Sequence, residues 1–254
     1  MLVCLRPRRQ KCGWVHEVPM ERQAEFDLQI LARTELFRGA DSRTLIEARD
    51  TAFKKRLAAG DVLFSQGDPT SELYIVVVGQ LRATQTTPDG QQIIIRYIGP
   101  GEFAGFMALS SGTNHPGSAV AVEETHLMGW SAGTIRGLME KHSGIALNAL
   151  AVLGARYHEM QTRLREIATE RVEQRIAHAI LRLAKHAGRT TPNGIEISIP
   201  LSRQDLAEMS GTTLHTVSRV LSSWESAGHV DTGRRRVMVR KLDALEGVAA
   251  MAPD

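Results

Sequence analysis

The segment SGTTLHTVSRVL, residues 210–221, combines an apolar stripe with a polar face at the spacing of a helix. The apolar stripe consists of Leu214, Val217, Val220 and Leu221. The polar face carries His215, Thr216, Ser218 and Arg219. Such a helix buries its stripe against its own domain and turns its polar side chains outward. The function of the segment therefore depends on what those polar side chains contact.

The residues before this helix meet the steric requirements of a helix-turn-helix. Ser202 and Asp205 in SRQDLAEM suit the N-cap and the first turn of a preceding helix. Ala207 is small where the two helices would cross, and Gly211 can adopt the backbone conformation that the turn needs. Val217 then supplies the buried contact of the second helix. These offsets predict a helix-turn-helix over residues 202–221.

A helix-turn-helix inserts the start of its second helix into the major groove of DNA. His215, Ser218 and Arg219 lie near that start, and we expect them to contact bases. Arg219 can donate two hydrogen bonds to guanine, which is worth about 1–3 kcal/mol of discrimination. Other residues are better placed for phosphates, which fix register without reading sequence: Ser202, Arg203, Thr213, Thr216, Arg234, Arg235 and Arg236. The alternative for the 234–236 arginine triplet is a solvated hairpin tip.

The chain divides into four parts. Residues 1–24 read as an irregular basic extension, and residues 25–142 as a β-roll sensor domain. Six short β-branched or aromatic segments between residues 60 and 130, punctuated by glycine and proline, predict antiparallel strands. Residues 143–171 predict one long helix, and residues 172–254 a winged helix-turn-helix in which RTTPNG is a turn and HVDTGRRRVMV a hairpin. The expected fold class is α+β.

The long helix carries an apolar heptad repeat along a narrow stripe, flanked by charged residues. Its members are Ala146, Leu150, Leu153, Tyr157, Met160, Leu164 and Ile167. A narrow stripe favours pairing with a second copy of the same helix, so we expect a homodimer. The alternative is a helix packed only on its own domain.

The composition of the chain excludes several classes of protein. With 43% hydrophobic and 23% charged residues the chain is typical of soluble globular proteins, and we expect no membrane contact. Two cysteines, Cys4 and Cys12, cannot cross-link 254 residues, which favours a reducing cytoplasm. Translation starts at Met1 or at Met20; the sequence leaves both open. No nucleophile–base pair, carboxylate pair or metal-ligand cluster indicates an enzyme.

LSRQDLAEMSGTTLHTVSRVLSSWESAGHV resembles the DNA-binding end of the CRP/FNR family of bacterial transcription regulators. AAGDVLFSQGDPTSELYIVVVGQLR and GPGEFAGFMAL resemble that family's cyclic-nucleotide-type β-roll, and the heptad helix takes the place of its dimerisation helix. The resemblance covers about residues 25–247. It implies a homodimer whose β-rolls sense a signal and whose helices reposition two DNA-binding heads. It also implies RNA polymerase as a partner, if the protein is an activator.

Within the family, Ser218 and Arg219 match the FNR branch, which prefers TTG-containing palindromes. His215 departs from the usual glutamate, which leaves the base that it would read open. NHPGSAVA and GTTLHTVSR are similar to segments of the nitric-oxide-responsive, denitrification-controlling branch. That likeness implies an activator that responds to nitric oxide or low oxygen.

The resemblance also bears on the effector. The family's cyclic AMP cassette has Glu and Arg where this chain has Phe106 and either Pro116 or Gly117; Ser118 remains. No Lys or Arg lies between Arg96 and Arg136, so we expect no cyclic AMP binding. An iron–sulfur cluster needs four thiolates and is not expected. Haem remains possible, with His16, His115, His126 and His158 as candidate ligands, although each also fits an ordinary surface or hydrogen-bonded histidine. The effector-pocket candidates are Phe106, His115, Ser118 and Gln161, with the signal passing to the helix near Met160.

Two other functions stay open. One is a ligand-binding regulatory module that acts on a protein partner through its winged helix. The other is a CRP/FNR-type regulator that needs no effector.

Overall fold

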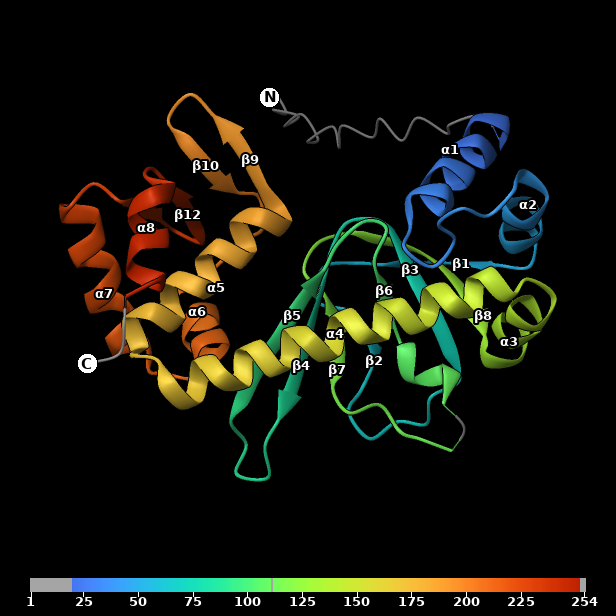
Figure 1. The fold of residues 1–254 in the computed structure, drawn as a ribbon, viewed down its shortest axis with the longest axis horizontal. Coiled ribbons are helices and arrows are strands. Elements are labelled where there is room, and N and C mark those ends of the chain that lie inside the picture. Colours follow the sequence, from blue (N-terminus) through green and yellow to red (C-terminus); the bar gives the residue numbers. More distant parts are fainter. Residues whose placement is uncertain (1–19, 111, 252–254) are drawn as a thin grey trace, which may run out of the picture.

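The computed structural model describes residues 20–110 and 112–251. The histidine and cysteines of the N-terminal stretch, His16, Cys4 and Cys12, lie outside the described residues. The chain forms a β-roll domain and a C-terminal domain, called here the head, joined by one long helix (Figure 1). This arrangement confirms the α+β fold class expected from the sequence.

The β-roll domain contains two short helices, eight strands, a 3₁₀ segment and a closing helix. In chain order they are α1 (Met20–Arg33), α2 (Ser42–Asp50), β1 (Phe53–Leu57), β2 (Val62–Phe64), β3 (Glu72–Val78), β4 (Leu81–Thr86), β5 (Gln92–Ile98), β6 (Phe103–Ala104), η1 (Phe106–Leu109), β7 (Ser118–Ala121), β8 (Thr125–Ser131) and α3 (Ala132–Lys141). The strands form two antiparallel sheets, ordered β1-β8-β3-β6 and β2-β7-β4-β5.

Strand β3 is apolar from Leu73 to Val78, and its residues from Leu73 to Val77 are buried. Leu73 and Ile75 pack with residues of the helices α1, α2 and α3. Tyr74 and Val76 pack between the sheets, against residues that include Leu81. A strand buried on both sides needs no polar alternation, which explains the unbroken sequence LYIVV.

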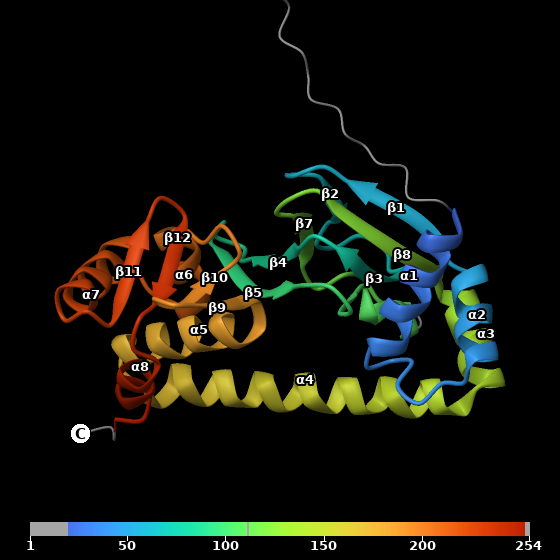
Figure 2. The ribbon, with the colours of Figure 1, turned by 90° about the horizontal axis from the view of Figure 1, so that it is seen from above.

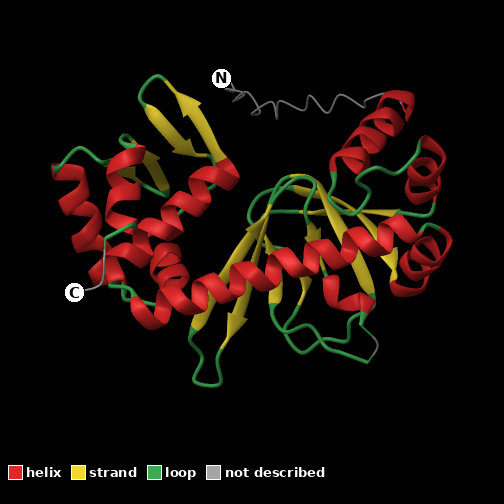
Figure 3. Ribbon diagram, in the orientation of Figure 1, coloured by secondary structure: helices red, strands yellow, loops and turns green. Residues whose placement is uncertain are grey.

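The head contains four helices and a small sheet (Figure 3). Its elements are α5 (Val172–Ala187), β9 (Gly188–Thr191), β10 (Gly194–Ile197), α6 (Arg203–Ser210), α7 (Leu214–Ser226), β11 (Val230–Gly233), β12 (Arg236–Val239) and α8 (Leu242–Ala249). The sheet order is β11-β12-β10-β9.

Helix α4 (Ser143–Thr169) runs along the β-roll and reaches the head (Figure 2). The β-roll and the head's helices α5 to α7 lie on one side of it (Figure 2). Ile145, Ala149 and Val152 are its buried apolar residues, and Ile145 and Ala149 belong to the core of the β-roll. Helix α4 ends at Thr169, and two residues separate it from α5, which begins at Val172.

The head also packs directly on the β-roll. Ile94 and Tyr97 of β5 are buried in the same apolar cluster as the core residues of α5, α6 and α7. Arg82 of β4 forms an ion pair with Asp205 of α6, with 2.9 Å between Nη1 and Oδ1. The roll and the head are therefore in contact through β4 and β5 as well as through α4.

Three local predictions were wrong or incomplete. Strand β1 was not predicted, because FKKRL lacks apolar alternation; Lys54 pairs with Asp27 at 2.6 Å, and Lys55 lies over the ring of Tyr74. Within the predicted turn RTTPNG, residues 189–191 belong to strand β9, which pairs with β10. The C-terminal helix α8 was also missed.

No helix among the described residues is both long and apolar enough to cross a bilayer.

Replacement of Gly79 by alanine is expected to destabilise the β-roll strongly. Gly79 has a φ of +87°, and an added Cβ would lie 2.3 Å from the carbonyl oxygen of Glu124. Gly90, at a φ of +85° with nothing within 4 Å, is the matched control. In urea unfolding we expect Gly79→Ala to lose about 3 kcal/mol and Gly90→Ala about 1 kcal/mol. Equal losses would contradict the close approach at Gly79.

Candidate nucleic-acid interface

The helix-turn-helix forms as the sequence predicts. Ser202 caps α6, since its Oγ accepts a hydrogen bond from the Asp205 N–H at 3.0 Å. Gly211 ends α6 in the left-handed conformation, with a φ of +62°. Ala207 and Val217 are fully buried in the core that α6 and α7 share with α5. These contacts fix the angle at which α7 leaves the turn.

Helix α7 lies at the end of the head that is remote from the β-roll (Figures 1 and 2). His215 and Arg219 are exposed on its surface, and Ser218 is half-buried. Thr213 caps the helix by accepting a hydrogen bond from the Thr216 N–H at 3.2 Å. The N-terminus of a helix attracts phosphate, so this end of α7 suits DNA. The roles in base reading stay predictions.

Leu214 corrects the sequence analysis in one respect. It was expected to join the buried stripe of α7, but it is 48% exposed. It occupies the first position of α7, beyond the part of the helix that packs on α6. The buried stripe consists of Val217, Val220, Leu221 and Trp224.

The candidate phosphate contacts on α6 already have partners within the head. The Ser202 hydroxyl lies 2.7 Å from Oδ2 of Asp205, to which it can donate. A role of Ser202 at phosphate would require that hydroxyl to leave the carboxylate. Arg203 donates to Oγ1 of Thr232 at 3.2 Å, which places its guanidinium beside the wing.

The wing presents two arginines outward. Arg234 and Arg235 are exposed between β11 and β12, and Arg235 has a φ of +57°. Arg236 instead pairs with Glu196 of β10, with 2.9 Å between Nε and Oε1. The hydrogen bond from Arg189 and the charge of Arg236 lower the pKa of Glu196, so this carboxylate stays ionised. Arg234 and Arg235 are therefore freer to contact phosphate than Arg236.

Two positioning residues were missed by the sequence analysis. Arg175 of α5 donates to the carbonyl oxygens of Ser210 at 3.0 Å and of Gly211 at 3.4 Å, so it holds the turn between α6 and α7. Glu225 of α7 accepts two hydrogen bonds from Thr232, from its N–H at 2.8 Å and its hydroxyl at 2.6 Å. Arg175 contacts the turn across more than thirty residues of sequence, and no local motif marks such a contact.

The heptad residues of α4 form an exposed apolar surface, called here the α4 seam. The exposed fraction of its six large side chains ranges from 49% at Leu153 to 68% at Leu164. Leu147, not predicted as a member, adds a further side chain that is 66% exposed. Apolar residues this exposed along one helix are typical of a surface that pairs with another chain.

Two of the predicted effector-pocket residues lie in one region of the β-roll. His115 is buried and stacks on Phe64, with ring centroids 3.7 Å apart and planes within 7°. Phe106 begins η1 directly after Gly105, where an added Cβ would lie 3.8 Å from Cε1 of His115. Gln161 instead is exposed on α4.

Gly117, one of the two positions at which the family's phosphate-binding arginine would fall in this chain, is tightly packed. A Cβ at Gly117 would lie 2.4 Å from the carbonyl oxygen of Thr84, so the backbone leaves no room for a side chain there. Ser118 accepts a hydrogen bond from the Gln66 N–H at 2.9 Å. At Gly117 the β-roll therefore lacks a cation for two reasons: the residue there is a glycine, and a larger side chain would not fit.

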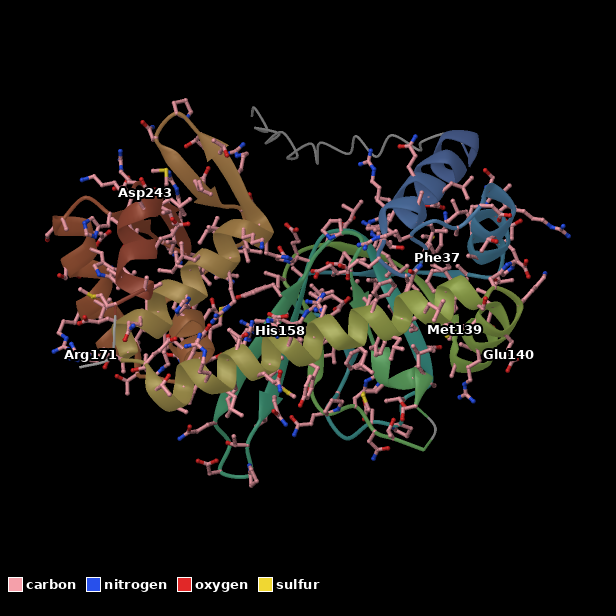
Figure 4. The ribbon with its side chains drawn as sticks, viewed as in Figure 1. Phe37, Met139, Glu140, His158, Arg171 and Asp243 are labelled. Atoms are coloured by element: carbon pink, nitrogen blue, oxygen red, sulfur yellow. The ribbon has the colours of Figure 1, made fainter. Side chains whose placement is uncertain are left out.

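The histidines predicted as haem-ligand candidates are in different environments. His126 is exposed and lies 3.0 Å from a carboxylate oxygen of Glu124. His158 is exposed midway along α4 (Figure 4). His115 is the buried one, and burial lowers its pKa. Within residues 20–110 and 112–251, no cluster of three or more His, Cys, Asp or Glu side chains could hold a metal ion.

Comparison with known proteins supports both domains. Residues 54–142 match the family model of the cyclic nucleotide-binding domain, and residues 174–248 match that of the Crp-like helix-turn-helix domain. The chain is 33% identical over 198 residues to the cyclic AMP receptor protein of Thermus thermophilus, which covers 78% of this chain and 88% of that protein. It is 24% identical over 196 residues to the fumarate and nitrate reduction regulatory protein of Escherichia coli, covering 77% and 78% of the two chains.

Solved structures agree on the fold. The structure of FixK2 from Bradyrhizobium japonicum superimposes with a TM-score of 0.70 at 22% identity, over 79% of this chain and 98% of that one. The two family models match this chain in the order in which the structure has the β-roll and the head. The chain therefore belongs to the CRP/FNR family of DNA-binding transcription regulators.

Proposed function

We propose that this protein is a homodimeric regulator that reads inverted-repeat promoter sites through α7. The observation that carries the proposal is the exposed placement of His215 and Arg219 at the start of a helix whose other face is buried. Arg219 is assigned to guanine in a TTG-containing half-site, in the manner of the FNR branch. Arg234 and Arg235 of the wing are assigned to phosphates.

The α4 seam supports the homodimer. Its side chains are exposed, whereas Ile145 and Ala149, on a different face of α4, are buried in the core of the β-roll. Pairing two seams would bury an apolar stripe from each subunit and place two heads side by side. Because a two-fold axis relates the two heads, the dimer would bind a DNA site with the same symmetry.

The salt dependence of DNA binding tests this proposal. We expect the affinity for an inverted-repeat duplex to fall about 10³-fold between 50 and 200 mM salt, if three basic residues of each subunit contact phosphates. The measurement is a fluorescence-anisotropy titration at several salt concentrations. Absent or salt-insensitive binding would contradict the proposal and favour the alternative module, which acts on a protein partner.

The effector is a separate proposal. The likeness to the denitrification branch and to a fumarate and nitrate reduction regulatory protein supports an activator that responds to nitric oxide or low oxygen and works with RNA polymerase. His115 is assigned as the haem ligand because, among the described histidines, it is the buried one beside Phe106 and Phe64, and burial lowers its pKa, which favours the neutral, ligating imidazole. Haem binding there would require Phe64 to move off the imidazole ring.

Absorption spectra test the haem proposal. We expect anaerobically purified protein to show a haem band on addition of haem, a shift of that band with nitric oxide, and loss of both in His115→Ala. His126→Ala, which removes an exposed histidine, should keep them. A protein-only spectrum in wild type would overturn haem binding and leave a regulator that needs another effector or none.

A further inference from the structure

A cavity of about 380 Å³ lies where the β-roll, α4 and the head meet. Its wall comes from β5, from the loop that follows β5, and from α4, α5 and α6. Six of its lining side chains carry basic groups: Arg96, Arg156, Arg163, Arg182, Lys185 and His186. Two carboxylates, Glu102 and Glu159, line it as well. A volume of this size is within the range of small-ligand sites.

The carboxylates neutralise these cations only in part. Arg96 and Arg156 donate to the same oxygen of Glu102, Oε1, each at 3.0 Å. Arg156 and Arg163 share Glu159, at 3.2 and 3.1 Å. His186 also lies 3.1 Å from Oε2 of Glu102, so three guanidiniums and one imidazole share two carboxylates.

Two further cavity cations lie on α5, and neither is paired with Glu102 or Glu159. Arg182 pairs with Glu166, outside the cavity lining, at 2.7 Å. Lys185 has no ion-pair partner among the described residues. The cavity therefore keeps a net positive charge.

Buried hydrogen-bond donors without acceptors also indicate that this cavity lacks negative charge. The Nε atoms of Arg96, Arg163 and Arg182 are buried and have no hydrogen-bond partner among the described residues. Buried donors are nearly always paired in native proteins, and an unpaired one is costly. Burial and the charge of Arg182 lower the pKa of Arg163, although Glu159 opposes the shift. An added anion would supply both the acceptors and the charge that this cluster lacks.

We propose that this junction cavity binds a small phosphorylated molecule with at least two negative charges. Guanidinium groups match the oxygens of phosphate through paired hydrogen bonds, and three of them converge here from β5 and α4. Tyr97, Leu183 and Met209 give the same cavity an apolar part that a compact organic group could contact. A ligand here would touch the roll, α4 and the head at once, so it would act on their relative placement.

Inorganic pyrophosphate is the probe for this site. Isothermal titration calorimetry on the full-length, DNA-free protein, with ionic strength held constant, is expected to show saturable binding that is tighter than that of inorganic phosphate. Because no DNA is present, the result does not depend on the proposed reading of promoters. Absence of saturable binding, or equal binding of both probes, would overturn the proposal.

Three single substitutions test whether pyrophosphate binds in the junction cavity. Lys185→Gln removes a cation that holds no ion pair, so folding should be unaffected, and we expect pyrophosphate affinity to fall about fivefold. Arg163→Gln should lower it at least about tenfold. Arg189→Gln removes the same charge from the exposed strand β9 and should leave affinity unchanged. Thermal unfolding without ligand checks that each variant is folded. Equal losses in Lys185→Gln and Arg189→Gln would mean general charge attraction and would contradict a built site.

Discussion

The Arg219→Ala variant is expected to bind an inverted-repeat duplex and a scrambled duplex with nearly the same affinity. Arg219 is the exposed sixth residue of α7, where a guanidinium can reach a guanine edge. Each lost bidentate contact is worth about 1–3 kcal/mol, so a dimer would lose about 2–6 kcal/mol of discrimination, or roughly 30-fold to 10⁴-fold. Competition titrations against the two duplexes measure this ratio directly.

Arg234→Ala is the matched control for Arg219→Ala. It removes an exposed arginine from the wing, where we expect a phosphate contact. Its affinity should fall by a similar factor on both duplexes, and the ratio between them should stay that of wild type. If Arg219→Ala also weakened both duplexes equally, Arg219 would be a phosphate contact and the assignment of base reading would be wrong.

The Met160→Lys variant is expected to separate the dimer into folded monomers. Met160 is 60% exposed on the α4 seam, so the change leaves the core of the subunit intact. In a paired seam the two lysines would face each other without water, which should raise the dimer dissociation constant at least about 100-fold. Sedimentation velocity over a range of protein concentrations gives the mass, and circular dichroism confirms that the fold is kept.

Ala155→Lys supplies the control for this variant. Ala155 is exposed on α4 outside the heptad, so the same charge there should leave the dimer unchanged. A Met160→Lys protein that remains dimeric at low concentration would place the subunit contact elsewhere than the α4 seam.

Short-range patterns predicted most of the fold and the helix-turn-helix. Gly211, Ala207 and Val217 serve the roles expected from their spacing, because a turn and a helix crossing impose local steric demands. Strand β1 escaped prediction because its stability comes from pairing with β8, over seventy residues away, and not from its own apolar pattern. Propensity describes a strand poorly when its neighbours supply the apolar contacts.

The functional sites show the same difference between features that follow from local sequence and features that depend on contacts between distant segments. The exposed face of α7 follows from helical periodicity, so its members could be named from sequence. The junction cavity could not, since Arg96, Arg163 and Arg182 come from three elements and meet only after the head packs on β5. Arg175 was missed for the same reason. Leu214 shows the limit of periodicity itself, because the stripe of a helix is buried only where a neighbour covers it.

The spacing of the two half-sites tests the central claim most directly. A dimer that pairs through the α4 seam presents two copies of α7 to major grooves one helical turn, about 34 Å, apart. We therefore expect two subunits to bind one inverted-repeat duplex, with affinity lost to the level of scrambled DNA when five base pairs are inserted between the half-sites. Unchanged affinity after the insertion, or one subunit bound per duplex, would contradict this account.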